Sequence, residues 1–363
     1  MLRLEPRAQL GWAQALASPL IALALTLAAG VLLFTLLGKD PAQALSLFFI
    51  EPLKSAYALS ELSIKAVPLL LIALGLAVCF RANVWNIGAE GQFVLGALGA
   101  GWVAMHAGPG SSGWILVPVQ ILVMSAGVLG GMLWAGIVAL LRDRFNTNEI
   151  LVSLMLVYVA TLLLNYLVYG PWKDPNGYNF PQTVLFDAST RLPRLIPGLR
   201  MNLGLVIALV LVALLLVFQF RTYCGYALTV GGLAPAAARY AGFSSRGAVW
   251  TALLLSGGLA GLAGAVEVAG PLGQLTPYVP VGYGFGAIIV AFVGRLHPVG
   301  IVFSSVLMSM FYIGGELAQS RMGLPKSLTS VFQGLLLFAL LACDQALLYR
   351  VRWQANSAKR AAA

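Results

Sequence analysis

Three side chains capable of polar chemistry lie at the start of an apolar, glycine-rich run, residues 84 to 100, which reads VWNIGAEGQFVLGALGA. They are Asn86, Glu90 and Gln92. Their amide and carboxylate groups can hydrogen-bond a polar molecule, and a carboxylate can also carry a proton. On an α-helix, Asn86 and Glu90 would share a face because they lie one turn apart. What these groups do depends on the elements that position them.

The composition places those elements in a membrane. Hydrophobic residues make up 60% of the 363-residue chain and charged residues only 9%. Apolar runs of about 20 residues, the length that spans a bilayer, recur along the whole sequence. We therefore predict an all-α, polytopic integral membrane protein with a single transmembrane domain over residues 1–363 and about ten spans. The predicted spans are residues 17–37, 62–80, 86–106, 115–141, 149–169, 202–219, 248–270, 283–294, 298–316 and 328–343.

Two of these spans differ from the others. The segments 62–80 and 283–294 are interrupted or short, so either could be a re-entrant or broken helix that lines a cavity. Such helices are common where a membrane protein surrounds a polar path.

The basic residues indicate how the chain is oriented. About ten spans put both termini on one side of the membrane, and a cytoplasmic location for them leaves the larger share of the 22 Lys and Arg residues on the cytoplasmic side. This orientation makes residues 170–201 an extracytoplasmic loop and residues 220–247 a cytoplasmic one. It also accounts for the net charge of +10 without a nucleic-acid partner, because no arginine-rich helix or aromatic RNA-binding pattern accompanies the charge.

Acidic residues inside an apolar chain need an explanation. Those inside or at the ends of predicted spans are Glu90, Glu149, Glu267 and Glu316. An unpaired charge at membrane depth costs about 2.5–3.5 kcal/mol, so each should face a cavity or a partner group. The group at residues 86–92 therefore has two interpretations. It could be the polar lining of a translocation path, or a cluster at a helix start that caps backbone amides and pairs with Arg81.

The other polar candidates lie at helix ends. Asn148 and Glu149 open the fifth predicted span, where they could cap the helix or line the path at its cytoplasmic end. Glu267 follows Gly257 and Gly261, whose GxxxG spacing allows two helices to approach closely. We expect Glu267 at a helix junction, with either a structural or a path-lining role.

The stretch FRTYCGYALTVGGLAPAAARYAGFSSRGAVW, residues 220 to 250, is a long cytoplasmic segment that contains a helix. Its PAAARYAG run predicts a short helix outside the membrane, with Pro235 in the first turn and Gly242 as the carboxyl-terminal cap. The small residues give this helix a low-profile surface suited to a groove in another protein. A helix lying on lipid is the alternative, but the run lacks bulky apolar anchors.

No motif for chemistry within the chain is present. The sequence contains no GxxxxGK[ST] nucleotide loop and no HExxH or GxSxG run. Its three cysteines, Cys79, Cys224 and Cys343, form no CxxC pair and lie near no histidine cluster, so neither disulfides nor a metal is indicated. We expect no enzymatic activity, cofactor or metal site in this chain, and energy must come from a partner or an ion gradient.

Three stretches carry a resemblance to a known family: RANVWNIGAEGQFVLGALGAGW, GGLAPAAARYAGFSSR and YGFGAIIVAFVGRLHPVGIVFSSVLMSMFYIGGELAQ. From about residue 60 to 345 the chain resembles the permease subunits of bacterial ABC importers for nucleosides and simple sugars, a ribose-type group similar to the branched-chain amino acid permeases. The NIGAEGQ motif looks closer to the nucleoside branch. The resemblance implies a type II importer-like permease with a cytoplasmic coupling helix, located as a multi-pass protein in the bacterial inner membrane.

The resemblance also implies partners besides membrane lipid. In that family the coupling helix sits in a cleft of a separate ATPase subunit, which binds ATP. Two permeases, homologous or identical, pair, and a periplasmic or lipoprotein solute-binding protein delivers the solute. By the resemblance, the ATPase contact would be formed by Pro235, Ala237, Ala238, Arg239 and Gly242. The candidate residues of the substrate path are Asn86, Glu90, Gln92, Asn148, Glu149 and Glu267.

The leading hypothesis is therefore the membrane-spanning permease of an ATP-driven importer for a nucleoside or simple sugar. The second is a proton-coupled secondary carrier that uses Glu90 or Glu267 as its proton site. A membrane-embedded enzyme comes third because its motifs are missing. The helix at residues 235–242 favours the first hypothesis, since a permease without a nucleotide site must receive force through a rigid projecting element.

Overall fold

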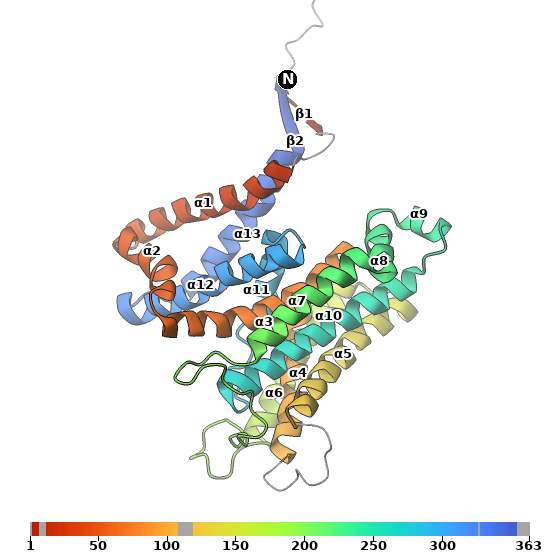
Figure 1. Ribbon diagram of the computed structural model, residues 1–363. Helices are drawn as coiled ribbons and strands as arrows, with labels where there is room; N and C mark the ends of the chain where they lie inside the picture. The colour runs from red at the N-terminus through yellow and green to blue at the C-terminus, as the bar shows by residue number, and fades with distance from the viewer. Residues whose placement is uncertain (1, 7–11, 108–118, 326, 354–363) are drawn as a thin grey trace, which may run out of the picture. The chain divides into compact units, whose positions relative to one another are not determined.

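The computed structural model describes residues 2–6, 12–107, 119–325 and 327–353, and Figure 1 shows the arrangement of its elements. The chain divides into two compact units. Unit 1 joins the chain up to Ile50 to the chain from Gly314 onward, and unit 2 is Glu51–Ile313.

Unit 1 brings together helices from the two ends of the chain. Its elements are β1 (Leu2–Pro6), α1 (Trp12–Leu36), α2 (Pro41–Phe49), the last part of α12 (Pro298–Met322), α13 (Ser327–Leu348) and β2 (Tyr349–Trp353). Strands β1 and β2 pair antiparallel as a two-stranded ribbon. Apart from this ribbon, the regular elements of the described residues are helical, which confirms the all-α prediction.

An aromatic cluster forms the centre of unit 1. The ring of Phe48 lies 6.2 Å from that of Phe34 and 5.2 Å from that of Phe332, so the cluster joins α1, α2 and α13. Helix α2 was not predicted. Its start is capped by the Asp40 side chain, which accepts a hydrogen bond from the amide of Ala42 at 2.9 Å.

Unit 2 contains most of the helices. Its elements are η1 (Glu51–Leu53), α3 (Ala56–Arg81), α4 (Ala89–His106), α5 (Val119–Phe145), α6 (Glu149–Tyr169), α7 (Gly204–Arg221), α8 (Tyr223–Leu233), α9 (Pro235–Tyr240), α10 (Ser245–Glu267), the π-helix η3 (Val268–Leu272), α11 (Tyr283–Val293) and α12 up to Ile313. Helices α3 and α10 are largely buried, whereas α5, α6 and α7 leave most of their surface uncovered. The buried pair forms the centre of this unit.

Glycines bring the backbones of α4, α5 and α10 into contact. A Cβ atom at Gly261 of α10 would overlap the carbonyl oxygen of Gly127 on α5, and one at Gly96 of α4 would overlap Gly261 itself. A Cβ atom at Gly257 would lie 2.6 Å from the carbonyl oxygen of Gly131. The close helix approach predicted from the GxxxG spacing is therefore confirmed.

Eight helices of the described chain are long and apolar enough to cross a membrane, and α11 is apolar but shorter. Each of the ten predicted segments coincides with a helix, although the start of segment 115–141 lies outside the described residues. The chain is a polytopic membrane protein by this count. The number of ten spans and the single domain over 1–363 stay predictions.

The segment 170–201 lies at the opposite end of unit 2 from α8 and α9 (Figure 1). It is irregular but anchored. The amides of Phe186 and Leu192 donate to the carbonyl oxygens of Gly273 and Ala269, each at 2.8 Å. These bonds fix the loop to the chain around η3.

Candidate translocation and coupling site

Asn86 and Gln92 form a buried pair with each other. The Asn86 Nδ2 group donates to Gln92 Oε1 at 2.8 Å, and Gln92 Nε2 donates to Asn86 Oδ1 at 2.9 Å. Asn86 Nδ2 also donates to the hydroxyl of Ser256 on α10 at 3.0 Å. All three side chains are fully buried. Their polar groups bind one another and join the start of α4 to α10.

Glu90 binds the start of a different helix. Its carboxylate accepts a hydrogen bond from the amide of Gly282 at 2.8 Å and another from the amide of Gly284, at the amino terminus of α11. Gly282 has a left-handed backbone with φ of 86°, which favours glycine. A Cβ atom at Gly284 would lie 2.6 Å from the Glu90 Cα atom, so the two helix starts touch. Glu90 thus ties α4 to α11.

This geometry settles part of the capping interpretation. Glu90 does bind backbone amides at a helix start, but those of α11 and not of its own helix. The expected pairing with Arg81 is wrong, because Arg81 Nε donates to the carbonyl oxygen of Leu296 at 3.0 Å.

Aromatic side chains surround the start of α11. The ring of Tyr283 lies 5.8 Å from that of Phe93, edge to face, and 5.6 Å from that of Tyr312. The Tyr312 hydroxyl donates to the carbonyl oxygen of Gly282 at 3.3 Å. These residues were not among the predicted site residues, although the YGFG run that starts α11 is an unusual pattern of aromatic residues and glycines for a membrane helix.

Asn148 and Glu149 stabilise the start of α6. The Asn148 side chain accepts from the amide of Ile150 at 2.9 Å, and Glu149 pairs with Arg142 of α5 at 2.7 Å. This arrangement corresponds to the capping alternative.

Glu267 ends α10, immediately before η3 interrupts the regular helix. Its side chain is buried, and the nearby positive charges that act on it are those of Lys65 and Arg200. Arg200 also pairs with Glu61 of α3 at 3.1 Å. The predicted position at a helix junction is therefore confirmed. The π-helical turn that follows is a feature often found at functional sites.

The predicted short helix is α9, and its ends form as expected. Pro235 is the first residue, and Gly242 follows the helix with φ of 84°. The amide of Phe243 donates to the carbonyl oxygen of Ala238, and the amide of Gly242 to that of Arg239, both at 3.0 Å. These two bonds define a Schellman motif, which stops the helix sharply.

Helix α8 was not predicted, and it precedes α9 within the segment predicted as a cytoplasmic loop. Thr222 caps α8 through the amide of Gly225 at 3.1 Å. Figure 1 shows both helices at the end of unit 2 where α7 ends and α10 begins. Segment 220–247 is therefore largely helical.

The side chains of α9 divide into two sets. Ala237, Arg239 and Tyr240 are exposed, Tyr240 at 96%, whereas Ala238 is only 4% exposed. Ala238 therefore packs inside the chain, which corrects its expected place on the surface offered to a partner.

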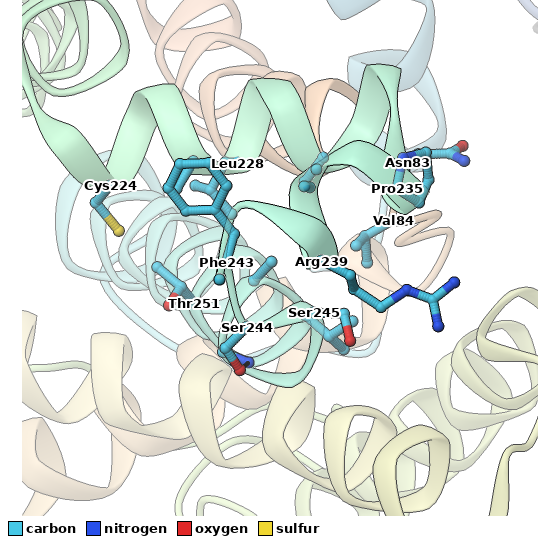
Figure 2. A pocket seen from close by; sticks show the side chains of 18 of the residues that line it. Asn83, Val84, Cys224, Leu228, Pro235, Arg239, Phe243, Ser244, Ser245 and Thr251 are labelled. Carbon is cyan, nitrogen blue, oxygen red and sulfur yellow. Dashed lines mark hydrogen bonds between the residues drawn. The ribbon is translucent and has the colours of Figure 1, made fainter.

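A cavity of about 550 Å³ lies beneath α9. Its walls come from α8, α9, the start of α10 and the α3–α4 turn, and they include Asn83, Cys224, Ala238 and Phe243. Figure 2 shows Cys224 on one side of this cavity and the Arg239 side chain reaching outward on the other. Rings of Tyr223 and Phe243 lie 5.6 Å apart and join α8 to the end of α9.

No group of three or more His, Cys, Asp or Glu side chains suited to a metal ion is found among the described residues. The three cysteines are free, with Cys79 and Cys343 buried. Outside the spans, burial lowers the pKa of His297, and the positive charge of Arg81 lowers it further. His297 therefore titrates below the usual histidine range.

Comparison with known proteins identifies the type of molecule. Residues 58–341 match the family described as "Branched-chain amino acid transport system / permease component". The chain belongs to this family. It is thus a multi-pass membrane permease of the ABC transporter type, and the relatives below favour this function over the proton-coupled carrier. Permeases of this family are not themselves catalytic.

Three relatives cover most of the chain. The glucose ABC transporter permease protein TsgB13 of Haloferax volcanii is 34% identical over 96% of this chain and 93% of its own. The guanosine ABC transporter permease protein NupP of Bacillus subtilis is 30% identical over 86% and 89%. The nucleoside ABC transporter permease protein NupB of Lactococcus lactis subsp. cremoris is 26% identical over 88% and 89%. No solved structure matches the chain.

Proposed function

We propose that this chain forms the translocation path of an ATP-driven importer and receives the force of ATP hydrolysis through α9. The observation that supports this most is the exposed surface of α9, on which Ala237, Arg239 and Tyr240 project with no covering from the described chain. Leu233, at the end of α8, is also 82% exposed. Tyrosine and arginine are enriched at surfaces that another protein covers, and both are exposed on α9.

The solute is proposed to be a nucleoside or a simple sugar. One of the relatives above is named for glucose, one for guanosine and one for nucleosides. These solutes share a sugar ring with several hydroxyl groups. We infer that the path of this chain accepts a molecule with such a ring. A nucleoside carries a base on this ring and a simple sugar does not, so the experiment must test whether the base is required.

The proposed assembly contains further subunits. A separate ATPase subunit binds ATP, a second permease, identical or homologous, pairs with this one, and a periplasmic or lipoprotein solute-binding protein delivers the solute. Both termini and α9 face the cytoplasm of a bacterial cell, and segment 170–201 faces outward. The basic residues that end α3, α5 and α7 support this orientation, because they flank the same end of unit 2 as α9.

We propose that the predicted path residues shape the path more than they contact the solute. Asn86 and Gln92 bind each other, and Glu90 binds the amides that start α11. The start of α11 would then form part of the wall of the path, because α11 is a short apolar helix and helices of this kind lie beside solute sites in membrane transporters.

Reconstituted vesicles test this function. The permease, its ATPase and its solute-binding protein are incorporated together, and uptake of labelled guanosine, ribose and glucose is measured with ATP inside or with a proton gradient alone. We expect ATP-dependent uptake of one of the three, inhibited by the same solute unlabelled. Uptake that follows the proton gradient in the absence of ATP would refute the proposal.

A further inference from the structure

We propose that Arg81 is a positioning residue that transmits movement of the α8–α9 segment to α11. This inference rests on the proposed function, since it concerns how force from an ATPase at α9 reaches the path. Arg81 holds the turn that follows α11, near α8. Glu90 holds the start of α11.

The first contact joins α8 to the end of α3. A Cβ atom at Gly232, in the last turn of α8, would overlap the carbonyl oxygen of Arg81 and would lie 2.9 Å from the carbonyl carbon of Ala82. The two backbones therefore touch without an intervening side chain. A shift of α8 must move the end of α3 or break this contact, because packed backbones are not compressible.

The second contact is made by the Arg81 side chain. Its Nε group donates to the carbonyl oxygen of Leu296 at 3.0 Å, and its guanidinium carbon lies 5.0 Å from the centre of the Phe220 ring on α7. The Phe220 ring in turn lies 5.3 Å from that of His297. One arginine thus joins the ends of α3 and α7 to the turn that connects α11 to α12.

That turn has an unusual backbone. Arg295 and Leu296 are consecutive non-glycine residues with φ of 57° and 53°. Left-handed backbone is disfavoured for such residues and persists only where surrounding contacts impose it. A Cβ atom at Gly294 would lie 2.7 Å from the amide nitrogen of Ile301, so the turn is closed by backbone contact as well. The hydrogen bond from Arg81 is one of the contacts that impose this conformation.

Helix α11 extends from this turn to Glu90. Its 11 residues correspond to about 16 Å at 1.5 Å per residue. The far end is fixed by the carboxylate of Glu90 and by the Tyr312 hydroxyl. A short rigid helix held at both ends moves as one body, so a change in the turn is carried to the residues around Glu90.

A purely structural role for Arg81 is the alternative, because a basic residue in the last turn of a helix stabilises the helix by itself. The two roles differ in what they change. A structural residue alters the amount of folded permease and its binding to the ATPase. A transmitting residue alters the solute moved per ATP hydrolysed while the complex still assembles.

The test uses the reconstituted complex with Arg81→Met, Arg81→Lys and the control Arg221→Met. Arg221 ends α7 and is exposed, so this control removes one positive charge near the same end of unit 2. ATP hydrolysis and solute uptake are measured in the same vesicles. We expect Arg81→Met to bind the ATPase normally but to move about tenfold less solute per ATP, within the usual range for coupled sites. Arg81→Lys should be intermediate, and Arg221→Met unchanged.

A second variant and a second measurement complete the test. Phe220→Leu keeps Arg81 and removes the ring beside it, and we expect a smaller fall in solute moved per ATP. In the double variant Arg81→Met, Glu90→Gln, the fold loss in solute moved per ATP should be smaller than the product of the fold losses in the two single variants, because both residues hold α11.

The inference is overturned if Arg81→Met moves as much solute per ATP hydrolysed as the wild type. It is also overturned by equal losses of ATPase binding and uptake, or by fully multiplicative losses in the double variant. If Arg81→Met does not fold, unchanged coupling in Phe220→Leu overturns it. Failure of the proposed function is a separate outcome, because the wild-type complex would then show no ATP-driven uptake.

Discussion

Replacing Glu90 by Gln should loosen the attachment of α11 while keeping the size of the side chain. The carboxylate accepts hydrogen bonds from the amides of Gly282 and Gly284. Glutamine has one acceptor oxygen, so one of these buried amides loses its partner and faces the new NH₂ group. A hydrogen bond to a charged group contributes about 1.5–3 kcal/mol, and a buried amide without a partner costs about 1–3 kcal/mol.

The relief of burying a neutral group in place of a charge offsets part of this loss. A net destabilisation of about 2 kcal/mol therefore follows, which corresponds to a fall in melting temperature of about 4 °C for a domain of this size. The assay is thermal unfolding of the purified permease in detergent, together with uptake in vesicles. Glu61→Gln is the matched control, because its pairing with Arg200 is partly exposed and should contribute less than about 1 kcal/mol.

This reasoning is refuted if Glu90→Gln abolishes uptake but lowers the melting temperature no more than Glu61→Gln does. Glu90 would then contact the solute or a proton directly. No change in either quantity would show that the two amide contacts do not hold α11 in the working transporter.

Three further predictions concern helix packing, the burial of Ala238 and the effect of pH. Gly261→Leu should abolish folding of unit 2, because any side chain there meets the Gly127 carbonyl oxygen; detergent-stable protein at wild-type yield would contradict it. Ala238→Trp should destabilise the fold because Ala238 is buried, whereas Ala237→Trp should not because Ala237 is exposed. The melting temperatures of the two variants test this, and equal values would contradict it. Folding lowers the pKa of His297. As the pH falls below about 6.5, the unfolded chain therefore binds a proton at this residue before the folded chain does, and the folded state becomes less stable. His297→Gln should therefore lose less thermal stability than the wild type between about pH 7 and pH 5.5, and equal losses would contradict the assignment.

The sequence predicted those features that are local. Apolar runs predicted the helices because a membrane helix satisfies its own backbone and needs about 20 apolar residues. The GxxxG spacing in α10 predicted close packing, and proline with glycine predicted both ends of α9. Helices α2 and α8 were missed because they are short and lie between the long apolar runs that served as the signal.

Contacts between distant segments were beyond the sequence. Glu90 and Gly282 are 192 positions apart, and Arg81 and Leu296 are 215 apart. The sequence pattern could predict that a buried carboxylate needs a partner. It could not predict that the partner would be the backbone amides of α11, because any residue type can supply a backbone amide and the pairing depends on how the whole unit packs. The burial of Ala238 depends on the same packing, since α8, the start of α10 and the α3–α4 turn enclose the cavity beneath α9 together with that helix.

The central claim is that force from a separate ATPase enters this chain through the exposed face of α9. It is tested most directly by ATP-driven uptake in vesicles that contain Ala237→Trp, compared with Ala188→Trp, an exposed alanine on segment 170–201 at the other end of unit 2. We predict that Ala237→Trp folds normally but neither retains the ATPase nor takes up solute, while Ala188→Trp retains ATP-dependent uptake. Full ATP-driven uptake by Ala237→Trp would contradict the account.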